Sequence, residues 1–191
     1  MRLHRDVSGS AVTEFALIAP IFLTLLMGAF DAGYNMWAMT ILQGALQESA
    51  RLSTIEGAAN NEATLDGIVS ASVKKLVPNA TLVFVRKSYT NFSDIGVPED
   101  WTDSNHNGTC DAGEPFEDAN ANGTWDRDRG TVGSGGARDA VLYTVSMTYP
   151  RAFPMTRLVG LSATVTTSAR TVLRNQPYKL QVASSKVGNC A

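Results

Sequence analysis

Residues 8–15 read Ser-Gly-Ser-Ala-Val-Thr-Glu-Phe and lead directly into an uncharged apolar stretch, Phe15–Phe30. Glu14 lies at the head of this stretch, five residues after Gly9. A carboxylate at such a place in a membrane-spanning helix is energetically costly, so it is retained where it has a function and a partner. The pattern therefore predicts a membrane helix whose first turns carry a functional glutamate.

More of the pattern follows, in order, between Gly9 and Arg51: Glu14-Phe15-Ala16-Leu17, then Pro20, a glycine-rich helix end and Ala45-Leu46-Gln47-Glu48-Ser49-Ala50-Arg51. The spacing of Gly9 and Glu14 is the layout of a type IV prepilin. The whole stretch resembles the TadE-like family of minor pilins (pseudopilins) from Tad/Flp pilus systems. The resemblance covers about a quarter of the chain, and the remainder is interpreted from its own residues.

The resemblance implies how this segment is processed and used. A prepilin peptidase would cut after Gly9, so that Ser10 becomes the N-terminus. Glu14 of one subunit would then neutralise the new amine of a neighbouring pilin, which lowers the cost of both charges. The implied partners are the prepilin peptidase, other pilins, pilus assembly proteins and the inner membrane, in a pilus used for adhesion.

Composition and the placement of charge predict the topology. Of the 191 residues 44% are hydrophobic and 18% charged, with a formal net charge of −2, which fits a folded domain plus a membrane segment. Basic residues are scattered, which argues against a nucleic-acid partner. Arg2 and Arg5 precede the apolar stretch and no basic cluster follows it. We therefore expect a single-pass protein of the bacterial inner membrane with a cytoplasmic N-terminus and a periplasmic or extracellular C-terminal domain.

Hydrophobic periodicity predicts an α+β fold. A helix from Ser10 to about Gly57, bent at Pro20, should cross the membrane with its first half. In its second half the polar positions are Thr40, Gln43, Gln47, Arg51 and Thr54, and the opposite positions, expected to pack on the domain, are Trp37, Ile41, Leu42, Ala45, Leu46 and Leu52. Tyr34 and Trp37 also suit a membrane interface.

The remaining elements make a small pilin-like domain. A second helix, capped by Asn60 or Asn61 and ended by Pro78-Asn79, carries Leu65, Ile68, Val69 and Leu76 on one face. Three runs rich in Val, Thr and Tyr, at Ala80–Tyr89, Asp139–Tyr149 and Leu161–Leu173, should form an antiparallel sheet. The predicted organisation is a leader at 1–9, a transmembrane half-helix at 10–33 and an extracytoplasmic domain at 34–191, with an insert at 94–138.

The insert is strongly acidic and contains a calcium-loop pattern. Residues 94–128 hold ten of the eighteen acidic residues and one base, Arg127. Within it, residues 103–114 place oxygen side chains at loop positions 1, 3, 5, 9 and 12 and a glycine at position 6, the arrangement by which a tight turn converges oxygens on Ca²⁺. The expected ligands are Asp103, Asn105, Asn107, Asp111 and Glu114, with the backbone carbonyl of Thr109.

The pattern repeats fifteen residues later. The expected ligands there are Asp118, Asn120, Asn122 and Asp126, with the carbonyl of Thr124. Arg129 stands where the bidentate glutamate should be, and Asp128, one residue earlier, is the expected substitute, so the second site should be weaker. The alternative is that Asn, Asp and Gly here build solvated turns without a metal, but two full repeats and so little compensating charge favour calcium.

Two cysteines, Cys110 and Cys190, lie in the part expected to be exported, where one disulfide can form. No nucleophile–base pair, P-loop or zinc spacing is visible, so the chain is not expected to be an enzyme. We therefore predict a minor pilin or pseudopilin with a calcium-stabilised domain. The alternative is a membrane-anchored, calcium-dependent adhesion module outside any pilus, and a secreted hydrolase with a signal anchor is a weaker third interpretation.

Overall fold

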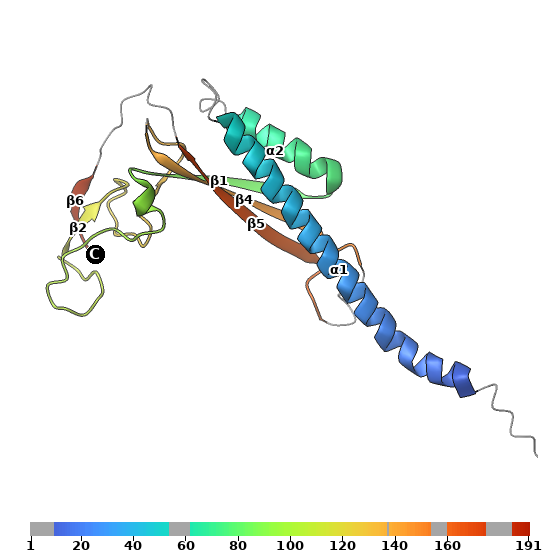
Figure 1. Ribbon diagram of the computed structural model, residues 1–191. Coiled ribbons are helices and arrows are strands. Elements are labelled where there is room, and N and C mark those ends of the chain that lie inside the picture. The colour runs from blue at the N-terminus through green and yellow to red at the C-terminus, as the bar shows by residue number, and fades with distance from the viewer. Residues whose placement is uncertain (1–9, 54–61, 137, 154–159, 175–184) are drawn as a thin grey trace, which may run out of the picture.

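The chain begins with one helix, α1, which runs from Ser10 to Ser53 and continues through Pro20. The computed structural model describes residues 10–53, 62–136, 138–153, 160–174 and 185–191 (Figure 1). At ~1.5 Å per residue α1 is about 66 Å long, roughly twice the ~30 Å hydrocarbon core of a bilayer. Residues 54–57, the predicted end of the helix, lie outside the described residues.

The first half of α1 projects away from the domain (Figure 1). Its large apolar side chains are exposed, among them Phe15, Leu17 and Ile21. Among the described residues this is one helix that is long and apolar enough to cross a membrane, and little of its apolar segment is covered by the protein. The predicted membrane segment is thus present as an uncovered apolar helix.

The second half of α1 is two-faced, as its periodicity predicts. Ala38, Leu42, Ala45 and Leu46 are buried, whereas the described polar positions, Thr40, Gln43, Gln47 and Arg51, are exposed. Trp37 departs from the prediction, because it lies beside the buried stripe and is 42% exposed. Its ring instead packs on that of Tyr34, with the centroids 5.6 Å apart.

The second helix, α2 (Glu62–Leu76), packs against α1. Its buried residues are Leu65, Val69 and Val73, spaced four apart along one face. Leu76, predicted for that face, is instead 42% exposed, because the buried stripe continues through Val73 to Val77. The proposed caps at Asn60 and Asn61 lie outside the described residues.

The main sheet has four strands in the order β3-β1-β4-β5. They are β1 (Thr81–Tyr89), β3 (Thr131–Val132), β4 (Ala140–Pro150) and β5 (Thr164–Arg174), and every pairing is antiparallel. Alternate residues of the central strand β4, Tyr143, Val145, Met147 and Tyr149, are fully or almost fully buried and join α1 and α2 in one core. Both helices lie along the sheet (Figure 1), which confirms the predicted α+β class.

A polar contact fixes the sheet to the junction between the two halves of α1. Asp31 of α1 is buried and forms an ion pair with Arg151, which directly follows β4. Asn35, one turn along α1, donates to Asp31 and accepts a hydrogen bond from the Tyr149 hydroxyl at 2.9 Å. These contacts tie one end of the sheet to the point where α1 leaves the apolar segment.

The acidic insert forms a separate lobe at the other end of the sheet (Figure 1). It begins with a single 3-10 turn, η2 (Phe92–Asp94), and contains β2 (Pro115–Asp118), which pairs with the C-terminal strand β6 (Lys186–Asn189). Neither β2 nor β6 was predicted from the sequence. The lobe is therefore built from the insert and the end of the chain together.

Candidate functional site

The first half of the loop at residues 103–114 is a tight turn around the carboxylate of Asp103. Asp103 Oδ1 accepts the backbone N–H of Asn107 at 3.2 Å, and Oδ2 accepts that of Gly108 at 2.8 Å. Asn105 Oδ1 accepts the same N–H of Asn107 at 3.0 Å. Gly108 has φ +77°, a conformation that costs glycine little and other residues more.

The second half of the loop returns two carboxylates to the turn. Asp111 accepts the side-chain amides of Asn105 (2.8 Å) and Asn107 (2.5 Å), and these bonds lower the pKa of its carboxyl. Glu114, which is 6% exposed, accepts the backbone N–H of Ser104 at 2.8 Å and of Asp111 at 3.1 Å. The carboxylates at loop positions 1, 9 and 12 are thereby joined to one turn by hydrogen bonds.

The second loop repeats this arrangement. Asp118 accepts the N–H groups of Asn122 at 3.0 Å and Gly123 at 2.9 Å, and Gly123 has φ +81°. Asp126 accepts the side-chain amides of Asn120 (2.8 Å) and Asn122 (2.5 Å). Each contact has its counterpart fifteen residues earlier, so the sequence repeat is also a structural repeat.

The residues at the end of the second loop contact β1 and segment 98–100. Asp128, the predicted substitute ligand, accepts hydrogen bonds from Lys87 Nζ at 2.6 Å and from the Tyr89 hydroxyl at 2.9 Å. Burial and the bond to Asp128 raise the pKa of Tyr89 to about 12. Arg129 pairs with Asp100 at 2.7 Å and donates to the carbonyl of Pro98. Asp128 therefore joins the insert to β1 through Lys87 and Tyr89.

In the second loop the corresponding N–H groups bind the carboxylate of Glu99, a residue that the motif did not predict. Glu99 Oε1 accepts the N–H of Ala119 at 2.8 Å, and Oε2 accepts that of Asp126 at 3.0 Å. Its side chain is completely buried. Because Glu99 precedes both loops, the position-by-position reading of the motif could not find it.

Short backbone pairings bring Glu99 there. The segment 99–102 runs beside β2: Thr102 N–H donates to the Pro115 carbonyl at 2.9 Å, and Glu117 N–H to the Asp100 carbonyl at 2.7 Å. Glu99 N–H donates to the Asp126 carbonyl at 2.9 Å. The entry and exit of the first loop are therefore clamped together next to the start of the second.

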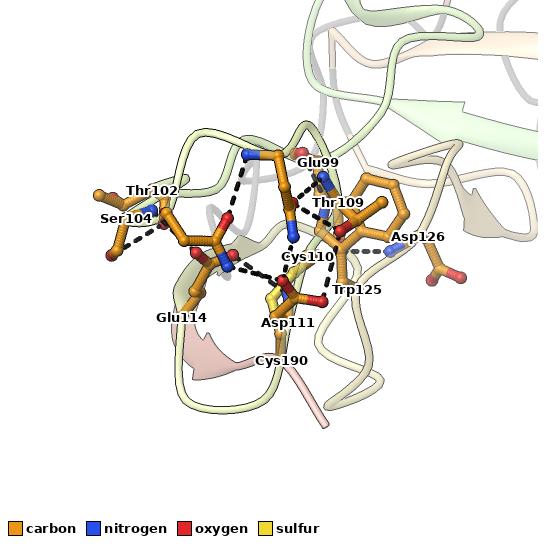
Figure 2. Close-up of a disulfide and its surroundings, with 12 residues drawn as sticks. Glu99, Thr102, Ser104, Thr109, Cys110, Asp111, Glu114, Trp125, Asp126 and Cys190 are labelled. Carbon is orange, nitrogen blue, oxygen red and sulfur yellow. Dashed lines mark hydrogen bonds between the residues drawn. A yellow bond between two sulfur atoms is a disulfide. The ribbon is translucent and has the colours of Figure 1, made fainter.

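A disulfide fixes the first loop to the C-terminus (Figure 2). Cys110, between Thr109 and Asp111, is bonded to Cys190, 80 residues along the chain, with a Cα–Cα separation of 5.7 Å. Two backbone hydrogen bonds flank it, from Gly113 N to Cys190 O at 3.0 Å and from Cys190 N to Glu114 O at 2.8 Å. At the equivalent position the second loop has Trp125, whose indole N–H donates to the Glu99 carbonyl at 2.8 Å.

The chemistry of the two loops is that of hard oxygen donors. Each combines carboxylates with asparagine amides, and an amide can turn either its oxygen or its nitrogen inward. Within the described residues there is no group of three or more His, Cys, Asp and Glu side chains gathered as a metal cluster. His106, at loop position 4, is exposed, and the loops' mixed oxygen sets are of a kind suited to Ca²⁺ rather than to softer metals.

The N-terminal residues singled out in the sequence are only partly described. Gly9 lies outside the described residues, and Ser10 is the first residue of α1. Glu14 lies one turn further on, with its side chain exposed among apolar neighbours. This arrangement places a carboxylate on the surface of the apolar half of α1.

Comparison with known proteins identifies one segment. Residues 9–51 match the family model described as TadE-like protein. No curated protein and no solved structure matches the chain. The matched segment is the described part of α1 up to residue 51, together with Gly9, and it does not include the sheet or the acidic insert.

Proposed function

From the TadE-like character of residues 9–51 we propose that this protein is a minor pilin or pseudopilin that takes part in assembling a Tad/Flp-type pilus used in adhesion. The match itself indicates a Tad pilus-associated protein with a membrane helix, a structural type rather than an enzyme. The observation that carries the finer proposal is the uncovered apolar half of α1 with Glu14 on its surface. Such a helix needs lipid or other helices around it.

The same segment supports a processing step. A prepilin peptidase in the inner membrane cuts after Gly9, leaving Ser10 as the N-terminus of the mature pilin, with the domain outside the membrane. Substituting Gly9→Val should block the cut because a branched side chain replaces the smallest one next to the scissile bond. Intact-mass measurement of protein extracted from host membranes should give a mature chain starting at Ser10 for wild type and an uncut precursor for the variant. Wild-type protein that keeps residues 1–9 would refute the prepilin assignment.

We also propose that the two loops bind Ca²⁺. Glu99, Glu114 and Asp118 are at most 6% exposed, and the structure gives none of them an ion pair within the described residues. A buried carboxylate is expensive unless a cation compensates it, either a basic side chain or a metal. Loop oxygens in the calcium-loop pattern, with buried charge still to be compensated, favour a hard divalent cation.

Calcium would give the lobe a stabilising ion that its small hydrophobic content does not supply. By compensating the charge of Asp103, Asp111 and Glu114 it would hold the first loop, and with it the docked C-terminus, in one conformation. Calorimetric titration of the full chain in detergent tests this directly. Absence of heat at millimolar Ca²⁺ would mean that the lobe is an acidic surface insert.

The second candidate function is a membrane-anchored adhesion module that binds calcium but never enters a pilus. The acidic lobe favours it, because the lobe lies outside the TadE-like segment and at the end of the sheet away from the membrane half of α1. The mass measurement separates the two functions, since an unprocessed anchor keeps residues 1–9.

A further inference from the structure

We propose that Glu99 is the closing, bidentate ligand of the second calcium loop, so that the lobe is a two-site module with equivalent ligand sets. The inference rests on the proposed calcium binding and adds to it a residue and a stoichiometry. It replaces Asp128 as the twelfth-position ligand of residues 118–129.

Glu114 and Glu99 have equivalent hydrogen-bond partners in the two loops. In the first loop Glu114 accepts the N–H of the residue after the first aspartate and the N–H of the ninth residue, at 2.8 and 3.1 Å. In the second loop Glu99 accepts the same two N–H groups, those of Ala119 and Asp126, at 2.8 and 3.0 Å. Glu114 is the last residue of its loop and Glu99 precedes both loops, yet the two carboxylates accept equivalent N–H groups.

Independently of the loop geometry, the carboxylates of Glu99 and Asp118 are buried. Glu99 is 0% exposed and Asp118 is 4% exposed. The five ion pairs found among the described residues lie elsewhere, on Arg86, Lys87, Arg129 and Arg151. These two buried carboxylates accept backbone N–H groups but have no basic side chain, and a bound cation would compensate their charge.

Asp128, the alternative ligand, already has two side-chain partners. Asp128 accepts hydrogen bonds from Lys87 Nζ at 2.6 Å and from the Tyr89 hydroxyl at 2.9 Å. To reach the second loop it would have to leave both partners and expose the charge of Lys87. Glu99 needs no such rearrangement.

With Glu99 included, the two loops have matching ligands. Each has two aspartates, one glutamate, two asparagines and one threonine carbonyl; in the second loop these are Asp118, Asp126, Glu99, Asn120, Asn122 and Thr124. Because the number of charged ligands largely sets calcium affinity, the second site should bind about as tightly as the first rather than more weakly.

The test is a calcium titration of the full-length protein in detergent, read by calorimetry and by Tb³⁺ luminescence excited through tryptophan. Trp125 lies within the second loop and Trp101 two residues before the first, with the ring centroids 5.1 Å apart, so the luminescence reports ion binding in the lobe and calorimetry gives the number of ions. Wild type should bind two ions. Glu99→Gln should bind one.

Matched variants complete the design. Glu114→Gln should also bind one ion, and Asp128→Asn should still bind two. Glu99→Asp keeps the charge on a shorter side chain and should weaken the second site at least about tenfold, which serves if Glu99→Gln fails to fold by circular dichroism.

Two outcomes would overturn the inference while leaving calcium binding intact: two ions of unchanged affinity in both Glu99 variants, or loss of one ion in Asp128→Asn. A wild-type chain that binds no ion would overturn the inference together with the calcium part of the proposed function. A single ion in wild type that is retained in Glu99→Gln would assign calcium to the first loop alone and would show that Glu99 is not a ligand.

Discussion

Individual carboxylates in this chain have roles that depend on their surroundings rather than on their place in a charge pattern. Glu14 is exposed on an apolar helix, Glu99 is buried against the second loop, and Asp128 is paired with Lys87 of β1. The residues that the motif selected between Asp103 and Glu114 are joined to one turn by hydrogen bonds because they follow one another along the chain, and calcium binding by them stays a prediction. The motif could not predict Glu99, because the backbone pairing of segment 99–102 with β2 brings that residue to a loop further along.

At this scale Glu14 gives the sharpest prediction. Glu14→Ala should leave membrane insertion unchanged, because the span becomes more apolar, but should reduce association with other pilins. Loss of one charge-assisted contact is worth about 1.5–3 kcal/mol, or roughly tenfold or more in binding. Quantitative co-purification from host membranes measures it. Glu48→Ala, an exposed acidic site on the same helix outside the apolar half, is the matched control and should have no effect; equal association for all three proteins would contradict the pairing of Glu14 with a neighbour.

At the scale of elements, α1, α2 and the three long strands were predictable because their periodicity extends over many residues. The short strands β2, β3 and β6 were not, since four residues or fewer carry too little pattern and their pairing depends on partners distant in sequence. Strand β6 is held by its ladder with β2 and by the disulfide from Cys190 to the first loop.

Removing that crosslink should therefore affect the two loops differently. Cys190→Ser opens a closure spanning 80 residues, worth about 4.5 kcal/mol of chain entropy in the simplest account. We expect the end of the chain to become sensitive to protease and the calcium affinity of the first loop to fall several-fold. The second loop, with Trp125 at the equivalent position, should change little. Lys186→Ala, which keeps the disulfide, is the control; parallel weakening of both loops in Cys190→Ser would show that the crosslink stabilises the lobe as a whole.

At the scale of the molecule, the protein is a long helix, apolar in its first half, with a helix-and-sheet domain on its second half and an oxygen-rich lobe at the far end (Figure 1). The fold class and the long apolar helix were predictable from the sequence. The way in which the C-terminus and the insert combine in one lobe was not, because it depends on pairings between residues far apart in the chain. The lobe buries few large apolar side chains, Phe116 being one of them, so its stability should depend strongly on its crosslink and on bound ions.

The central claim, that calcium holds this lobe in its fold, is tested most directly by thermal unfolding of the full chain in detergent with Ca²⁺, with Mg²⁺ and with a chelator. A hundredfold excess of Ca²⁺ over its Kd should add about 2.7 kcal/mol and raise the Tm by about 5–10 °C for each site. Mg²⁺ should raise it far less, since it demands a tighter octahedral geometry. Glu114→Gln should lose about half of the gain, and Asp94→Asn, which neutralises an acid outside both loops, should keep all of it. A Tm that is the same in Ca²⁺, in Mg²⁺ and in chelator would contradict the account.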